Sequence, residues 1–298
     1  MKLPSVCQTI ATWLVLATIA TPHAHAAITH DWPADGDATD TVGDADGTLV
    51  GGTSFGPGLF DQGFVFDGVD DAVTFGANVG NFGTSDFTIG FVIQSTNMTN
   101  LEGLLGKREL CQFGSFWDIR SSPSGYLGFE VYENNVNTGV GTTVPVNDGL
   151  FHTVVFTREG TVVSSYVDGF FNAQRDVGFT ANVTNNAALT AGASACSGAG
   201  DGTVRFTGLL DEIRIADTAD PTILPPVFHC ADANRSGDVS AADALVALRT
   251  AVALETCDLC LCDINGSGTV TAPDALAILQ RAVSLPVTPL CPLCPVEL

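Results

Sequence analysis

The sequence predicts an all-β sandwich or barrel over residues 27–218, followed by a small helical domain of two loop–helix repeats over residues 228–298. In the first segment, apolar and polar residues alternate with period two in several short runs, which is typical of strands with one buried face. Residues 219–227 form a proline-containing linker. After the linker the apolar residues follow a helical period, so we expect a second domain of a different class.

Residues 1–26 are organised like a signal peptide. Lys2 supplies a positive charge, residues 10–20 are apolar and uncharged, and residues 24–26 read Ala-His-Ala, which fits the small-x-small rule for cleavage. The alternative, a membrane anchor, is disfavoured because the apolar stretch is short for a bilayer. No later segment is a candidate span. We therefore expect a secreted protein, extracellular or at the cell surface, with no membrane span.

The chain is strongly acidic, with a formal net charge of −22 and only two lysines. A surface without a basic patch cannot replace the counterions of phosphate groups, so nucleic acid and anionic lipid are excluded as partners. An acidic surface suits divalent cations, although a generic acidic secreted surface explains much of this charge.

The expected strands of the first domain are short and separated by turn residues. The runs with period two are 87–93, 126–132, 154–156, 162–167 and 213–215. Sequences such as Asn147-Asp148-Gly149 and Asp168-Gly169 punctuate them. Many short strands with such punctuation form sandwiches and barrels.

Short motifs are distributed along nearly all of residues 28–218. They are His30-Asp31-Trp32, Asp35 to Asp37, Asp44 to Leu49, Phe66 to Asp71, Asn147 to His152, Tyr166 to Gly169 and Gly208 to Ile215. Together they resemble the LamG-like, concanavalin A-like jelly rolls, the group of laminin G and pentraxin domains. The resemblance implies two antiparallel sheets, a role in binding glycans or proteins, and a disulfide between Cys111 and Cys196.

Many proteins of that group hold one structural calcium ion at the rim of the sandwich. The candidate ligands in this chain are Asp70, Asp71 and Asp211. In the other interpretation, Asp67 and Asp168 belong to hairpin turns and Asp211 satisfies backbone groups. The sequence leaves both interpretations open.

The sequence gives little support to the hypothesis that the first domain is a hydrolase. A glycoside hydrolase needs two carboxylates flanking the bond, and the nearest pair, Glu130 and Glu133, would face opposite sides of a strand. Residues 52–56 match G-x-S-x-G but lack the following helix of a nucleophile elbow. His152 begins a strand and is more simply a packed residue than a base. We therefore predict a protein that is not an enzyme.

The second domain is duplicated. Ten residues recur 31 positions later, and they include both charged loop residues and apolar helix residues. The first set is Asp232, Asn234, Ser236, Gly237, Val239, Asp243, Leu245, Leu248, Val252 and Leu254. The helical periods that follow the two loops cover 242–254 and 273–285, and we expect the repeated aliphatic residues of the two helices to pack together.

Each repeat carries oxygen donors at the spacing of a calcium loop of the EF-hand type. Calcium takes six to eight hard oxygens on a tightly curled backbone, and a glycine at position 6 permits the turn. The predicted ligands of loop 1 are Asp232, Asn234, Ser236, the carbonyl of Asp238, and Asp243. Those of loop 2 are Asp263, Asn265, Ser267, the carbonyl of Thr269, and Asp274. Ser240 and Thr271 are candidates for ligation through water. The alternative is a pair of capped turns without an ion.

This duplicated loop-plus-helix pattern, over roughly residues 230–286, resembles a type I dockerin domain. The resemblance implies a domain that folds on calcium and docks onto a cohesin-like protein. The chain departs from the family at loop positions 10 and 11, which help to select the cohesin and are Ala241-Ala242 and Ala272-Pro273 here. These departures and the surrounding cysteines leave the docking partner open.

Eight cysteines remain after the candidate signal peptide, an even number in a chain expected to be exported. Six of them surround the repeats: Cys230, Cys257, Cys260, Cys262, Cys291 and Cys294. Two CxxC pairs among them could hold zinc, but an oxidising destination favours three disulfides whose connectivity the sequence does not choose.

The sequence as a whole predicts a secreted, non-catalytic binding protein. Its sandwich would recognise a glycan, a protein or another cell-surface ligand, and its tail would hold two calcium ions and serve attachment or assembly. Two alternatives remain: an extracellular polysaccharide-degrading enzyme and a purely structural surface protein.

Overall fold

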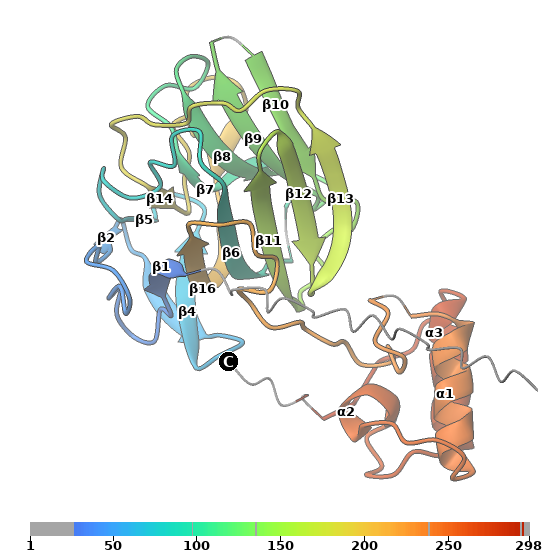
Figure 1. Ribbon diagram of the computed structural model, residues 1–298. Coiled ribbons are helices and arrows are strands. Elements are labelled where there is room, and N and C mark those ends of the chain that lie inside the picture. Colours follow the sequence, from blue (N-terminus) through green and yellow to red (C-terminus); the bar gives the residue numbers. More distant parts are fainter. Residues whose placement is uncertain (1–26, 97, 135, 238, 293, 295–298) are drawn as a thin grey trace, which may run out of the picture.

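The computed structural model describes residues 27–96, 98–134, 136–237, 239–292 and 294, and it contains a β-sandwich and a small helical tail (Figure 1). The candidate signal peptide and Asp238 lie outside the described residues. Two stacked antiparallel sheets confirm the predicted all-β sandwich. Among the described residues, no helix is long and apolar enough to cross a membrane.

The first sheet has eight strands, all paired antiparallel. In spatial order they are β13 (Phe170–Asp176), β12 (Val162–Val167), β11 (Phe151–Glu159), β6 (Phe87–Gln94), β16 (Thr207–Ala216), β4 (Gln62–Asp67) and β3 (Ser54–Pro57), with β1 (Ile28–Trp32) beside β16.

The second sheet also has eight strands. In spatial order they are β10 (Val136–Gly141), β9 (Leu127–Glu133), β8 (Phe116–Ser121), β7 (Leu101–Lys107), β14 (Thr190–Ala191), β5 (Ala72–Thr74) and β2 (Thr48–Val50), with β15 (Thr203–Arg205) parallel beside β7.

The core lies between the sheets and follows from the period-two alternation. Phe87 and Phe91 of β6 point inward and are fully buried, as are Phe129 and Val131 of β9. The rings of Phe87 and Phe129 meet edge to face with centroids 6.0 Å apart, a favourable geometry for aromatic pairs. The intervening residues of β9 and β10 point to the outer face of the second sheet, where the candidate site lies.

The segment predicted as a linker packs against the outer face of the first sheet. Ile223 and Leu224 are buried there with Val155 and Ala216. A Cβ added at Gly90 of β6 would lie 2.9 Å from Ile223, so this glycine lets the segment approach closely. The segment is therefore a fixed connection to the tail.

The tail contains α1 (Ala241–Ala251), α2 (Leu259–Cys262) and α3 (Ala272–Ala282). Capping boxes start the two long helices: Ser240 pairs with Asp243, and Thr271 pairs with Asp274. Both helices end three residues earlier than predicted. Shortly after each C-cap a residue takes a left-handed conformation, Ala253 at φ +58° and Ser284 at φ +59°, which terminates the helix.

The expected packing of the repeated leucines and valines is wrong. The small core of the tail is built from alanines, cysteines and a few larger side chains such as Leu261, Ile264 and Ile278. The eight repeated aliphatic side chains are 41–72 % exposed: Leu245, Leu248, Val252, Leu254, Leu276, Leu279, Val283 and Leu285. Ala247 of α1 and Ile278 of α3 are instead fully buried in this core.

All six cysteines of the tail are paired in disulfides, which excludes the zinc alternative for the CxxC pairs. The pairs are Cys230–Cys291, Cys257–Cys262 and Cys260–Cys294. Two of them tie the C-terminal segment to the start and the middle of the tail. Cross-links of this kind each contribute about 2–4 kcal/mol by restricting the unfolded chain, which suits a domain with so thin a core.

Candidate functional site

The outer face of β8, β9 and β10, here called the polar face, is hollowed by a cavity of about 590 Å³. Gly128, Gly139 and Gly141 occupy outward positions on it, so backbone forms part of the floor. The polar side chains of Arg120, Glu130, Asn137 and Arg175 line the cavity together with Tyr126.

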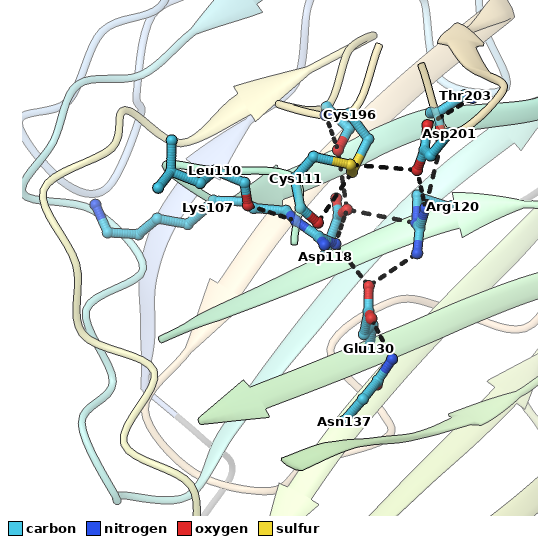
Figure 2. A network of polar contacts seen from close by, with 12 residues as sticks. Lys107, Leu110, Cys111, Asp118, Arg120, Glu130, Asn137, Cys196, Asp201 and Thr203 are labelled. Atoms are coloured by element: carbon cyan, nitrogen blue, oxygen red, sulfur yellow. Dashed lines mark hydrogen bonds and ion pairs between the residues drawn. A yellow bond between two sulfur atoms is a disulfide. The ribbon is translucent and has the colours of Figure 1, made fainter. Parts of the chain in front are cut away.

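Glu130 is the centre of a network of charged hydrogen bonds on this face (Figure 2). Its Oε2 accepts from Nη1 of Arg108 at 2.6 Å and from Nη2 of Arg120 at 2.9 Å. Its Oε1 accepts from the amide of Asn137 at 2.5 Å. Arg120 also donates to Asp201 at 3.3 Å. Charge-assisted bonds of this kind hold side chains in one geometry.

Asp118 lies beneath this network and is fully buried. Its Oδ2 accepts from Arg108 at 3.1 Å and from the hydroxyl of Ser194 at 2.9 Å, whereas its Oδ1 has no hydrogen-bond partner among the described residues. Burial raises the pKa of Asp118 to about 6, against the opposing effect of Arg108 and Arg120.

An aromatic stack supports the arginine from the side. The guanidinium of Arg108 lies 3.7 Å from the ring centroid of Phe116, and Phe116 stacks on Tyr132 with the rings 5° from parallel. The Arg108 side chain is only 5 % exposed. Arg108 therefore holds Glu130 in place from within, while Arg120, Asn137 and the 41 % exposed Tyr126 face the cavity.

The polar face offers donors and acceptors in fixed positions beside an aromatic ring. The adjacent guanidinium, carboxylate and amide groups can form hydrogen bonds with vicinal hydroxyls. A shallow face with a few precisely placed polar groups is suited to orienting a ligand. Sequence reasoning considered Glu130 only as a carboxylate for hydrolysis, and it missed Arg108, Asp118, Arg120 and Asn137. The alternation in β8 could have indicated that Asp118 and Arg120 share a face, but not that the β8–β9 register places Asp118 opposite Glu130.

The two predicted calcium loops have the same local structure. In loop 1, Oδ1 of Asp232 accepts from Ser236 N at 2.9 Å and Oδ2 accepts from Gly237 N at 2.8 Å. Asp243 closes the loop from the helix, because its Oδ1 accepts from Asn234 N at 2.9 Å. The Asp232 and Asp243 side chains are buried, and burial together with the charge of Asp243 raises the pKa of Asp232.

Loop 2 repeats these contacts. Asp263 accepts from Ser267 N at 2.9 Å and from Gly268 N at 2.6 Å, and Asp274 accepts from Asn265 N at 3.2 Å. The carbonyl of Thr269 accepts from the Ser267 hydroxyl at 3.0 Å. Gly237 and Gly268 have φ of +89° and +84°, the region that glycine adopts at little cost.

The structure does not bring the three calcium candidates of the sandwich together. Asp71 accepts from Gly52 N and Asp67 N, and the carboxylates that converge are those of Asp67, Asp70 and Asp71. Thr207 pairs with Asp67, so Asp211 lies four residues further along β16, roughly 13 Å away at 3.3 Å per residue. Its carboxylate accepts instead from Leu59 N and Phe60 N.

The rejected catalytic candidates are engaged in structural contacts. Glu133 accepts from Asn182 N at 2.8 Å, away from the Glu130 network. Ser54 of the G-x-S-x-G string begins strand β3 and is not followed by a helix.

The structure pairs Cys111 with Cys196 beside the polar face.

Residues 67–220 match the family model described as the concanavalin A-like lectin/glucanases superfamily. Among curated proteins, none matches the chain. Three solved structures share the fold at low sequence identity.

The first is domain 4 of AbnA, an extracellular arabinanase from Geobacillus stearothermophilus, in complex with arabinotriose. The TM-score is 0.55 at 17% identity, covering 67% of this chain and 97% of that one. The second is the binding domain of Paraclostridial Mosquitocidal Protein 1, with a TM-score of 0.52 at 14% identity and coverage of 65% and 50%. The third is the receptor binding domain of the botulinum neurotoxin C/D mosaic serotype, with a TM-score of 0.50 at 10% identity and coverage of 65% and 48%.

Proposed function

Because the chain belongs to the concanavalin A-like lectin/glucanases superfamily, we propose that its sandwich is a non-catalytic module that binds a glycan at the polar face. The observation that carries this proposal is the network centred on Glu130. It fixes one carboxylate, one amide and one guanidinium at the edge of a 590 Å³ cavity that also contains Tyr126. Rigid, prepaired polar groups lower the cost of ordering the site on binding.

The fold neighbours support a glycan as the class of ligand. One of them was solved with arabinotriose, which has vicinal hydroxyls of the kind the Arg120–Glu130–Asn137 edge could pair with. The exposed ring of Tyr126 would stack on the apolar face of a sugar.

A glycan array with the mature chain tests this proposal, followed by calorimetry with the best ligand. Asn137→Ala and Tyr126→Ala should each weaken binding by about 5- to 100-fold, the equivalent of 1–3 kcal/mol for losing one buried polar or aromatic contact. Asn100→Ala and Phe171→Ala are matched controls, because both side chains are exposed away from the cavity. Absence of any ligand, or equal binding by all four variants, would contradict the proposal.

The enzyme alternative predicts turnover. Both carboxylates considered for hydrolysis are committed: Glu130 to two arginines and Glu133 to the backbone of Asn182. Release of sugar from a polysaccharide that is abolished by Glu130→Gln or Glu133→Gln would replace the binding proposal by a catalytic one.

For the tail we propose one calcium ion in each loop. The donor set fits this ion, because every candidate ligand is an oxygen and each loop contains two carboxylates. The ligands would be Asp232, Asn234, Ser236, the carbonyl of Asp238 and Asp243 in loop 1, and Asp263, Asn265, Ser267, the carbonyl of Thr269 and Asp274 in loop 2. Calcium would neutralise these buried carboxylates and hold the loops closed.

Calorimetry with calcium tests these sites on the full mature chain. We expect two sites with dissociation constants on the order of 10⁻⁵ to 10⁻³ M, because each loop has only two ligating carboxylates. Asp274→Asn should remove one site and leave the other. A chain that shows no heat at millimolar calcium would refute the proposal.

We propose further that the protein is secreted and that the tail attaches it to a partner. The four disulfides suit an oxidising compartment. The exposed leucines and valines of α1 and α3 offer an apolar face, which in soluble proteins commonly marks an interaction site. A calcium-dependent pull-down with a purified cohesin module tests the cohesin-like partner, and Leu248→Asp should abolish it.

A further inference from the structure

Three side chains that are distant in the sequence meet where the tail leaves the sandwich. His152 belongs to β11, Asp168 lies in the turn between β12 and β13, and His229 is at the start of the tail. Oδ2 of Asp168 lies 2.8 Å from Nδ1 of His152 and 2.9 Å from Nε2 of His229. The three ligand atoms all lie within 4.8 Å of one another.

The two imidazoles approach this point from different directions. Their ring centroids are 4.9 Å apart and their planes are inclined by 55°. Donors about 2.0–2.1 Å from a tetrahedral zinc ion are roughly 3.3 Å apart. The observed spacing therefore needs only a small outward movement of the side chains to admit an ion.

The surroundings orient the three side chains for this role. Nε2 of His152, the nitrogen that points away from the centre, lies 3.1 Å from Oδ1 of Asp148. A carboxylate on the remote nitrogen is the usual way in which proteins fix a metal-binding imidazole. The second oxygen of Asp168 is held by Thr153 N at 3.0 Å, which leaves Oδ2 directed at both rings.

The electrostatics of the cluster favour a cation at its centre. His152 and Asp168 are 4 % and 6 % exposed, whereas the Asp148 side chain is 52 % exposed and that of His229 is 19 % exposed. The Asp168 carboxylate lies between the two rings, and Asp148 places a second carboxylate on the outer side of His152.

The three side chains leave one position of a tetrahedral site for a fourth ligand. A cavity of about 370 Å³ lies beside His229, but neither His152 nor Asp168 borders it. Sites with three protein ligands and one open position take a water molecule as the fourth ligand.

We propose that His152, Asp168 and His229 form a zinc site that joins the sandwich to the tail. Two nitrogen donors and one carboxylate match zinc, whereas calcium requires a set of six to eight oxygens. The sandwich alone supplies only His152 and Asp168, so the site is complete only when the tail is seated. Zinc would thereby fix the tail against the sandwich.

Zinc titration of the mature chain by calorimetry tests the site. Calcium is kept in excess, so that the acidic surface and the two loops are occupied by calcium. The wild type should bind one zinc ion, and His229→Gln should weaken binding at least about tenfold, because loss of a ligand costs more than loss of its supporting group. His229 is partly exposed, and circular dichroism verifies that the variant folds.

His30→Gln is the matched control. His30 also pairs with a carboxylate, Asp40, at 2.6 Å, but it lies outside the cluster and its loss should leave zinc affinity unchanged. Cobalt(II) gives an independent readout, since a tetrahedral site with two nitrogens produces visible absorption that His229→Gln should remove. The proposal is overturned if the wild type binds no zinc under these conditions, or if His229→Gln binds zinc as tightly as the wild type.

Discussion

Replacing Asp118 by asparagine should change how the stability of the sandwich depends on pH. Burial raises the pKa of this carboxyl from 3.8 to about 6. Between these two pH values the folded state binds more protons than the unfolded state, so the free energy of unfolding falls as the pH rises through this window. The shift of about two units corresponds to about 3 kcal/mol. Asparagine keeps the shape of the side chain but does not ionise, so the variant lacks this fall.

The measurement is urea unfolding of the wild type and Asp118→Asn between pH 3 and pH 7. The attraction of Arg108 and Arg120 for the charged carboxylate is already contained in the pKa of about 6. The stability of the variant relative to the wild type should therefore rise by up to about 3 kcal/mol across the window. A difference that stays flat, or that falls with pH, would refute the account of Asp118 as a carboxyl governed by burial.

Asp201→Asn provides the control, because this carboxyl contacts the same Arg120 from a more exposed position. Burial raises the pKa of Asp201, but hydrogen bonds from Thr203 together with the charges of Arg120 and Arg108 outweigh it and leave the pKa below its usual value. The pH dependence of its difference from the wild type should therefore have the opposite sign.

Three further predictions concern stability measured by urea unfolding. Arg158→Met should lower the free energy of unfolding by about 3 kcal/mol or more. The buried guanidinium donates to several backbone carbonyls, and these would lose their partner. Gly268→Ala should lower the free energy of unfolding by about 1–2 kcal/mol through backbone strain alone, since the added methyl group meets no neighbour within 4 Å. Gly237→Ala should lower it further, because the ring of Phe170 lies 3.0 Å from the added methyl group. Leu276→Ser should change stability by less than about 0.5 kcal/mol, whereas Ile278→Ala should cost about 2–4 kcal/mol, since the first is exposed and the second fully buried.

The sandwich was predictable because a strand with one buried face has an alternation that the sequence shows directly. Phe87 to Ile93 predicted β6, and the class followed from several such runs. The pairing of strands was not predictable in this way. The β8–β9 register places Asp118 opposite Glu130, and it depends on packing across the whole sheet. The polar face was missed for this reason, although Asp118, Arg120, Glu130 and Asn137 occupy outward positions that the alternation allows.

In the tail, the sequence motif predicted the local structure of the loops, but it did not predict how the helices pack. The spacing of the duplicated loops predicted that they would be alike, and Asp232 and Asp263 make the same local backbone contacts. Their calcium ligands stay a prediction. The helix faces were assigned wrongly. Leucines at 245 and 248 have the same three-residue spacing as the alanines at 244 and 247, so the pattern alone did not decide which pair faces α3. The structure buries Ala244 and Ala247 and leaves Leu245 and Leu248 exposed.

Because the alanines, and not the repeated leucines and valines, are buried in the core of the tail, the recurrence of these aliphatic side chains in both repeats needs another explanation. A core of alanines and cysteines buries little apolar surface, so the tail needs other stabilisation, which the three disulfides provide and the proposed calcium ions would extend. The repeated leucines and valines then contribute little to the folded tail, yet they recur at the same spacing in both halves. Since these side chains are repeated but exposed, we infer that their role is in the surface of the tail and not in its core. The two helices present similar aliphatic rows, so a partner that fits α1 would also find a related surface on α3.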